Sequence, residues 1–265
     1  VSAVLGLALS SMLIGVPTIV LARRWVATTR WKINFSLLGE SLKGGMIVQW
    51  ALTAHTFTPY AGLFILNYFL DLDSVGWFAT GLGLASLILI VAQASRTVLQ
   101  AWMPQASPES GQIILLTVQF TRYTIIVMGI ATLGLLILGY PLITILYGAE
   151  FQPAYVPMVI LLGGAMARGT GQIIVSYLTL ERQFLAAGFT AFLGMFVSIG
   201  LAWYLVPIAG IWGAALASMV GQISTTALVT YWFIRKTDVR SWDLIPRTED
   251  VKTIISTIKL RIARG

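Results

Sequence analysis

Long apolar runs separated by short polar segments make up most of the chain. Each run approaches the roughly 20 helical residues that cross the hydrocarbon core of a bilayer. The runs lack the period of two that marks a half-buried strand, and a spanning helix satisfies its backbone hydrogen bonds internally. The pattern therefore predicts an all-α fold, a polytopic bundle of about seven transmembrane helices. The predicted spans are residues 1–22, 44–70, 75–95, 123–147, 156–180, 184–206 and 208–234.

Basic residues gather in every second connection between these spans and in the tail. All but one of the 17 Lys and Arg follow this arrangement, whereas the intervening connections carry Asp71, Asp73 and Glu150. The positive-inside rule places the basic connections on the cytoplasmic side. We therefore predict a multi-pass protein of the cytoplasmic (inner) cell membrane with a cytoplasmic C-terminus.

Composition narrows the function classes. Hydrophobic residues make up 57% of the 265 residues and charged residues only 10%, whereas soluble domains carry about 25% charged residues. A soluble enzyme and a disordered chain are therefore excluded. The absence of cysteine excludes a disulfide scaffold and a thiolate metal site. The net charge is +7, and the Lys and Arg residues lie between the apolar runs. They therefore indicate membrane topology, and we expect no nucleic-acid partner.

Polar side chains inside the predicted spans form stripes on four helix faces. A single stripe is well explained by hydrogen bonds between helices, but four stripes in one bundle favour a shared water-accessible cavity. The stripe residues expected to bind a substrate there are Gln49, Thr53, Thr56, Tyr60, Gln93, Gln172 and Gln222.

Arg168 lies at the middle of the predicted span 156–180. An arginine at that depth costs about 2.5–3.5 kcal/mol on the insertion scale. No Asp or Glu of the chain is predicted at the same depth, so its partner would be water, backbone, an absent part of the protein or an anionic ligand. Arg168 is therefore a candidate substrate-binding residue, and structural pairing with an absent half is the alternative.

His55 and Pro59 form a second feature at similar depth. Proline has no N–H, so Pro59 predicts a kink in the span 44–70. His55 points about 120° away from the polar stripe of its own helix. A histidine packed between helices is the favoured interpretation, and a proton-coupling group beside a hinge is the alternative.

The sequence contains no catalytic constellation. Paired carboxylates within one span, a Ser–His–Asp arrangement, a phosphate-binding loop and a histidine-rich metal site are all missing from it. We expect a protein that is not an enzyme and that needs neither a cofactor nor a metal.

Three ordered segments resemble the polysaccharide (O-antigen) flippase family of the multidrug/oligosaccharidyl-lipid/polysaccharide (MOP) exporter superfamily. They are DSVGWFATGLGLASLILIVAQASRTVLQAWMPQ from Asp73, YPLITILYGAEFQPAYVPMVILLGG from Tyr140, and VPIAGIWGAALAS from Val206. The resemblance covers most of the chain. It implies a MATE-like transporter of two lobes that flips a polyprenyl-diphosphate-linked oligosaccharide by alternating access, for assembly of a cell-surface polysaccharide.

The resemblance also implies a division of the chain. Residues 1–22 would be the last helix of the N-terminal lobe, 23–43 a basic cytoplasmic linker between lobes, and 44–234 the six-helix C-terminal lobe. Residues 235–265 would be a basic cytoplasmic tail, whose amphipathic stretch fits either membrane lipids or solvent. The chain begins inside an apolar run without Met, so we expect the remaining N-terminal lobe as a partner in the same protein.

Cavities in this family are cationic, which suits a diphosphate. Arg168 would fit that role, with Arg96, Arg122 and Arg182 near the cytoplasmic mouth. A drug or cation antiporter of the same superfamily is an alternative, although a cation exporter is expected to carry an acidic residue in its cavity and this half has none. Two further alternatives remain. One is a non-transporting membrane scaffold of a glycan-assembly complex, and the other, less favoured, is a membrane glycosyltransferase.

Overall fold

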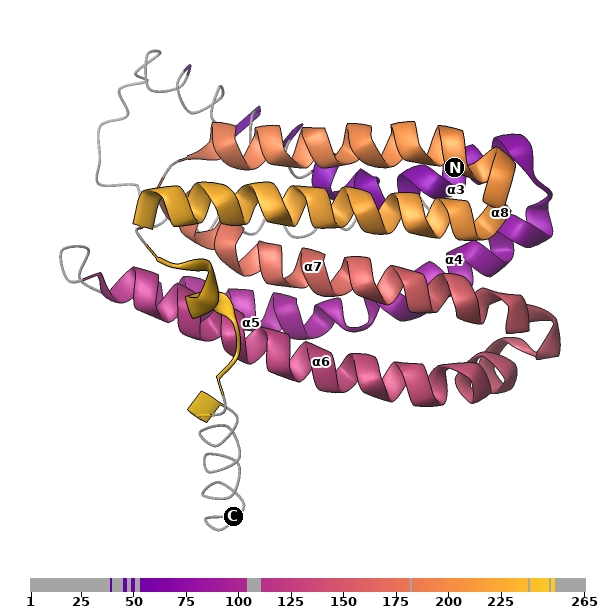
Figure 1. Cartoon of the computed structure of the whole chain (residues 1–265), viewed down its shortest axis with the longest axis horizontal. Helices are drawn as coiled ribbons and strands as arrows, with labels where there is room; N and C mark the ends of the chain where they lie inside the picture. Colours follow the sequence, from indigo (N-terminus) through magenta and orange to yellow (C-terminus); the bar gives the residue numbers. More distant parts are fainter. Residues whose placement is uncertain are drawn as a thin grey trace, which may run out of the picture. The chain divides into compact units, whose positions relative to one another are not determined.

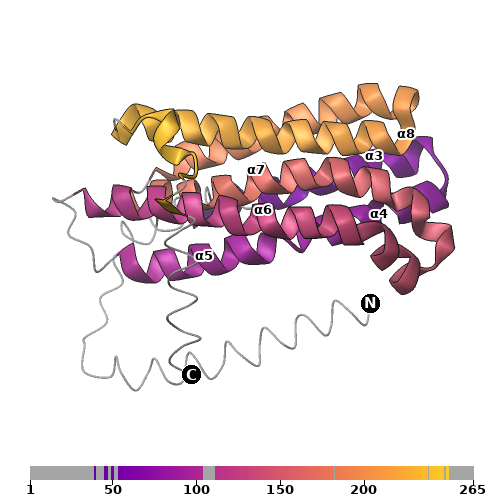
Figure 2. The same cartoon turned by 60° about the horizontal axis from the view of Figure 1, so that its bottom comes forward.

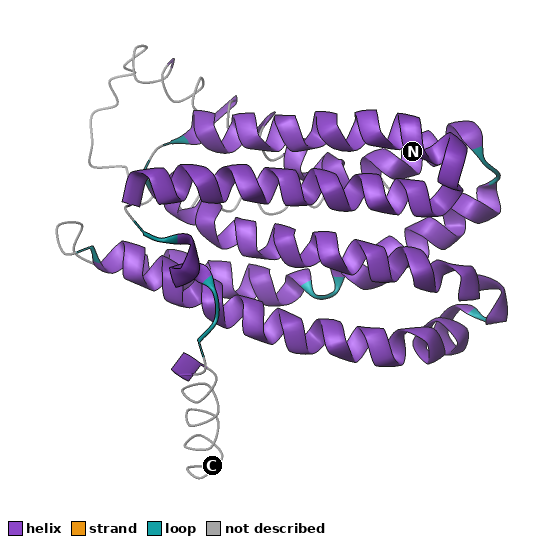
Figure 3. Cartoon of the chain, viewed as in Figure 1, coloured by secondary structure: helices purple, strands orange, loops and turns teal. Residues whose placement is uncertain are grey.

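The computed structural model describes residues 39, 45–46, 49–50, 53–103, 111–181, 183–237, 239–247 and 249–250. The chain divides into two compact units, Val1–Lys43 and Gly44–Gly265, and every element below belongs to the second. The predicted first span, nearly all of the basic linker and the amphipathic stretch of the tail lie outside the described residues. The described elements are all helical, as predicted (Figure 3).

The α-helix is interrupted at Pro59, where the sequence predicted a kink. Helical residues 53–57 lead into the 3-10 turn η1 (Thr58–Tyr60), which is followed by α3 (Ala61–Phe69). Proline has no N–H to donate to the carbonyl four residues earlier, so the chain forms one tighter 3-10 turn before the α-helix resumes.

The next span is longer than the sequence predicted. It consists of α4 (Leu72–Ser86) and α5 (Leu89–Trp102), which are separated by a short turn. The Ser74 side chain lowers the pKa of Asp71, and a carboxylate there suits the positive end of the α4 dipole. The predicted end at residue 95 was wrong, because the charge of Arg96 interrupts the apolar run without ending the helix.

The same correction applies to α6 (Gln112–Tyr147). It begins well before the predicted residue 123, so Arg122 lies inside the helix and not at its edge. Gly148, with φ of 95°, ends α6, and the turn η4 (Ala149–Ala154) leads into α7 (Tyr155–Leu180). The bounds of α7 agree with the prediction.

The last element, α8 (Phe184–Thr237), contains the two predicted final spans as a hairpin. Its 54 residues would extend about 80 Å as one straight helix at 1.5 Å per residue. Gly210 adopts φ 58° and ψ −133°, a conformation available to glycine, and α8 folds back there (Figure 1). The break therefore falls at Gly210 and not at Pro207. We call residues 184–209 and 211–237 its first and second halves.

Helix α7 is the centre of this unit. It packs against α4, α5, α6 and α8, while α3 packs against α8 (Figures 1 and 2). One apolar cluster includes Phe78 and Met158, and another includes Leu99, Tyr177 and Phe233. By contrast, α6 directs many of its apolar side chains outward, as a lipid-facing helix does.

Four described segments are long and apolar enough to cross a membrane. They are Leu72–Trp102, Gln112–Tyr147, Ala149–Leu180 and Phe184–Thr237. The prediction of a membrane protein with an all-helical transmembrane bundle is therefore confirmed for the described part of the chain.

Candidate functional site

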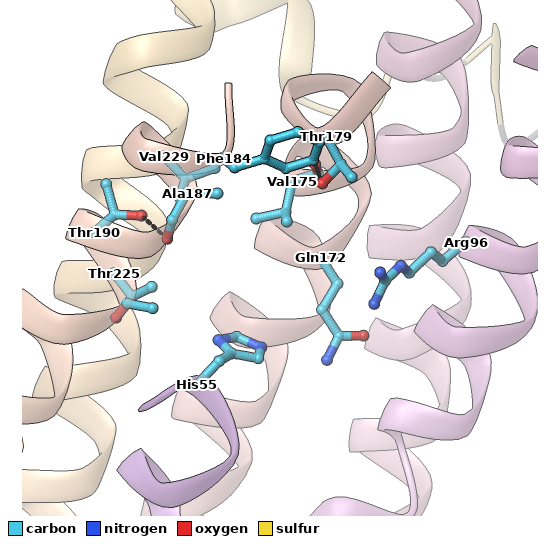
Figure 4. A pocket seen from close by; sticks show the side chains of 11 residues that line it. His55, Arg96, Gln172, Val175, Thr179, Phe184, Ala187, Thr190, Thr225 and Val229 are labelled. Carbon is cyan, nitrogen blue, oxygen red and sulfur yellow. Dashed lines mark hydrogen bonds between the residues drawn. The ribbon is translucent and has the colours of Figure 1, made fainter. Parts of the chain in front are cut away.

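A small cavity lies inside the bundle, between α5, α7, the two halves of α8 and the helical residues before η1. Its volume is about 110 Å³, and most of its wall is apolar. Figure 4 shows the polar side chains that reach it. They are His55, Arg96, Gln172, Thr179, Thr190 and Thr225.

Arg168 has a partner that the sequence did not predict. Its Nε donates a hydrogen bond of 3.3 Å to Nε2 of His55. Because Nε2 accepts, that nitrogen carries no proton, and the histidine is in the tautomer protonated at Nδ1. The expectation that Arg168 relies on water, backbone, an absent part of the protein or a ligand was therefore incomplete. Histidine matches its hydrogen bond but leaves its positive charge unmatched.

Arg96 and Gln172 bring unused polar atoms to the cavity. Nε of Arg96 and Oε1 of Gln172 are both buried and have no hydrogen-bond partner among the described residues. The Gln172 side chain, only 7% exposed, extends between His55 and Arg96 (Figure 4). Neither Arg96 nor Arg168 forms an ion pair with a described carboxylate.

The predicted polar stripe of the first helix lies on a different surface. Gln49, Thr53, Thr56 and Tyr60 line an open groove of about 520 Å³ together with apolar side chains. Arg168 is within electrostatic reach of both Tyr60 and His55. Arg168 contacts His55 of the cavity wall, although it is not among the residues that line the cavity or the groove. The stripes do not share one cavity, because His55 and the stripe occupy different sides of their helix, as their 120° separation predicted.

Gln93 and Gln222 do not line the cavity. Gln93 is exposed on α5. Gln222 donates from Nε2 to the carbonyl of Ser218 at 3.2 Å. Its side chain packs against Gly164 so closely that a Cβ added to this glycine would lie 3.0 Å from Nε2. In this unit Gln222 therefore contributes to the contact between α7 and α8. This contact agrees with the alternative that its polar stripe serves helix packing.

The kink at Pro59 is fixed from α8. Ser198 donates to the carbonyl of Thr58 at 3.2 Å, and Ser218 donates to the carbonyl of Pro59 at 3.4 Å. The turn that follows His55 is thereby tied to both halves of the hairpin. The sequence signal for these contacts is small: serines among the glycines and alanines that let helices approach closely.

Arg122 is occupied by the tail. Its Nε donates to the carbonyl of Asp243 at 2.6 Å, and its terminal nitrogens pair with the carboxylates of Asp243 at 4.0 Å and Asp250 at 3.7 Å. These contacts do not support the prediction that Arg122 serves an open mouth. Arg182 lies outside the described residues.

The described residues contain no group of three or more His, Cys, Asp or Glu side chains that could hold a metal ion. Thr179 and Thr225 belong to the polar stripes of the spans 156–180 and 208–234, and both line the cavity. The sequence missed Thr190, since a single threonine on an apolar helix gives no distinguishing signal. The hydroxyls of the three threonines donate to the carbonyls of Val175, Ala187 and Gly221.

Known proteins resemble this chain in their three-dimensional structure and not in their sequence. No protein-family model matches the sequence, and no characterised protein matches it closely. The chain is similar to the outward-facing and inward-facing conformations of a multidrug resistance MATE family transporter of the MOP superfamily, each with 18% identity and with TM-scores of 0.55 and 0.54. It is also similar to a MOP superfamily transporter from Pyrococcus furiosus, with 19% identity and a TM-score of 0.52.

Each alignment covers 79% of this chain. The chain has the fold of one half of a MATE-like transporter. It spans about half the length of these structures, 49%, 48% and 51% respectively for the outward-facing, Pyrococcus and inward-facing chains. The Pyrococcus protein is described as having a binding pocket of reverse polarity that suggests a different function. The predicted MATE-like fold is confirmed by these similarities, whereas the flippase family stays a prediction.

Proposed function

We propose that the protein is a membrane flippase that moves a polyprenyl-diphosphate-linked oligosaccharide across the cytoplasmic membrane. The observation that carries this proposal is the environment of Arg168. It is a half-buried cation in the middle of α7 whose hydrogen-bond partner is an uncharged His55. A cation in an apolar environment is stabilised by an anion, so the cargo that gains most there is anionic.

The groove beside Arg168 suits the rest of such a cargo. A row of amide and hydroxyl groups gains nothing from contact with lipid tails, so the groove of Gln49, Thr53, Thr56 and Tyr60 faces water or the second lobe. The diphosphate would bind near Arg168 and the sugars would follow the groove. Rocking of one lobe against the other would then expose the cargo to each side in turn.

A drug or cation antiporter is the second candidate, because two of the similar structures are of a multidrug resistance transporter. Cationic cargo would be repelled by Arg96 and Arg168, since like charges at close range in a low dielectric are costly. A scaffold that does not transport makes a different prediction, namely that loss of the Arg168 charge leaves glycan export intact.

The test is complementation of a strain that lacks the gene. Lipid-linked glycan on the cytoplasmic side is measured after rescue with the full-length gene, with its Arg168→Ala form, or with Arg235→Ala. Arg235 is an exposed arginine near the end of α8 and serves as the charge-matched control. We expect the unmutated and Arg235→Ala genes to clear the glycan-lipid and Arg168→Ala to leave it. Clearance by Arg168→Ala would favour the scaffold, and a strain without accumulation would redirect the test to drug efflux.

A further inference from the structure

We propose that the cavity inside this unit is itself a binding site for a phosphate-sized oxyanion, held by Arg96 and Gln172. It is separate from the cargo groove and does not depend on the flippase proposal. One water needs roughly 10–15 Å³ of such a cavity, so about 110 Å³ holds several waters or one small oxyanion. A sugar chain does not fit.

The polar groups of the cavity divide into used and unused ones. The three threonine hydroxyls donate within their own helices, to Val175, Ala187 and Gly221. The unused groups are Nε of Arg96 and the amide oxygen of Gln172. Buried polar atoms without partners are uncommon, and each calls for a water, an ion or a ligand.

The chemistry of the unused groups selects an anion with several oxygens. Arg96 offers a planar fork of N–H donors, which matches phosphate geometry better than a point charge does. The amide of Gln172 can donate through Nε2 or, by accepting through Oε1, bind a protonated phosphate oxygen. His55 also lines the cavity.

The charge balance points the same way. Arg96 and Arg168 both act electrostatically on His55, and neither is paired with a carboxylate in the described part of the chain. Two cations near one apolar-walled space leave a positive potential that one anion would offset. His55 joins this site to Arg168 and therefore to the cargo groove.

Binding of inorganic phosphate to the purified full-length protein in detergent tests the site. Titration calorimetry at constant ionic strength is done on the unmutated protein, Arg96→Gln, Gln172→Met and the charge-matched control Arg235→Gln. We expect the unmutated protein and the control to bind phosphate equally. Arg96→Gln removes a charge-assisted contact and should weaken binding roughly ten- to a hundredfold; Gln172→Met should weaken it by a smaller factor.

A second arm identifies the source of the phosphate. A short-chain prenyl phosphate in the same micelles replaces the inorganic ion. Arg96-dependent binding of either probe supports the site, and binding of only the prenyl probe assigns it to a lipid headgroup. Absence of binding by both probes, or equal binding by Arg96→Gln and the unmutated protein, overturns the proposal.

Two controls keep the result interpretable. If size-exclusion chromatography shows that Arg96→Gln does not fold, Gln172→Met and Arg96→Lys carry the test, because Lys keeps the charge and loses the fork. The complementation assay is run on the same variants. A variant that has lost phosphate binding but still clears glycan-lipid shows that the site is separate from cargo transport. Arg96-dependent phosphate binding by a protein whose deletion strain accumulates no glycan-lipid supports the site without the cargo assignment, so the two proposals can fail separately.

Discussion

Arg122 and Arg168 are half-buried arginines in long apolar helices, yet their surroundings differ in one respect. Arg122 is met by a carbonyl and two carboxylates from the tail. Arg168 is met by a neutral ring nitrogen of His55. A cation whose charge is matched within the fold is committed to structure, while one whose charge is unmatched is available to a ligand. Two arginines that were predicted for one cationic path therefore have different partners in the structure.

The strongest way to break this comparison is to give Arg168 a carboxylate. His55→Glu places an anion where Nε2 now accepts, so Arg168 becomes paired as Arg122 is. We expect glycan clearance to fall roughly ten- to a hundredfold, because the cargo loses its charge partner. Stability should change by only about 1 kcal/mol, since a buried pair gains little over its desolvation cost.

His55→Gln is the matched control for that substitution. Its amide oxygen can accept from Arg168 without adding charge, so clearance should stay near that of the unmutated gene. Thermal unfolding of both variants in detergent checks that they fold. Normal clearance by His55→Glu would show that the Arg168 charge is not what the cargo recognises.

The next test removes the matched arginine. Arg122→Met keeps the apolar stem and leaves the Asp250 carboxylate without its cation, while the Asp243 carboxylate keeps its ion pair with Arg247 at 2.6 Å. Since hydrogen bonds to charged groups contribute about 1.5–3 kcal/mol, we expect a loss of that size in thermal unfolding and faster proteolysis of the tail. Phosphate binding to the cavity should be unchanged. An Arg122→Met variant with unaltered stability but lost glycan clearance would reverse the roles assigned to Arg122 and Arg168.

A smaller effect is expected from the serines that fix the kink. Ser198→Ala and Ser218→Ala each remove one donor to the carbonyl of Thr58 or Pro59, at a cost of about 0.5–1.5 kcal/mol each. The turn follows His55, which accepts a hydrogen bond from Arg168. The double variant should therefore also displace Arg168 and weaken glycan clearance. Lower unfolding temperatures with normal glycan clearance would show that the turn stabilises the fold without positioning Arg168. If neither the unfolding temperature nor clearance changed, the structural role of the two serines would be contradicted.

Much of the fold could be predicted because apolar length and charge distribution report the span of each helix directly. The errors have physical causes. Arg96 and Arg122 ended the apolar runs but not the helices. The final turn falls at Gly210 and not at Pro207, because Pro207 stays within helical backbone while Gly210 leaves it.

The candidate site was predictable only in part. Depth alone identified Arg168, and helical geometry put His55 and the polar stripe on different sides. The contact between Arg168 and His55 joins positions 113 residues apart, so it depends on how two helices cross. A hydropathy pattern carries no information about that crossing. For the same reason Gln222 could not be separated from Gln172 before the packing against Gly164 was known.

The smallest predicted effect sharpens the comparison on the side of Arg122. Asp243→Asn removes a half-exposed carboxylate, but the Asp243 carbonyl that accepts from Arg122 at 2.6 Å and the Asp250 carboxylate both stay. Exposed ion pairs contribute about 0.2–1 kcal/mol, so its unfolding should shift far less than that of Arg122→Met. Asp250→Asn should cost more, because Asp250 is less exposed and also accepts from the Arg247 backbone at 2.8 Å. Equal losses for Asp243→Asn and Arg122→Met would mean that the exposed carboxylate, and not the buried part of the cluster, holds the arginine.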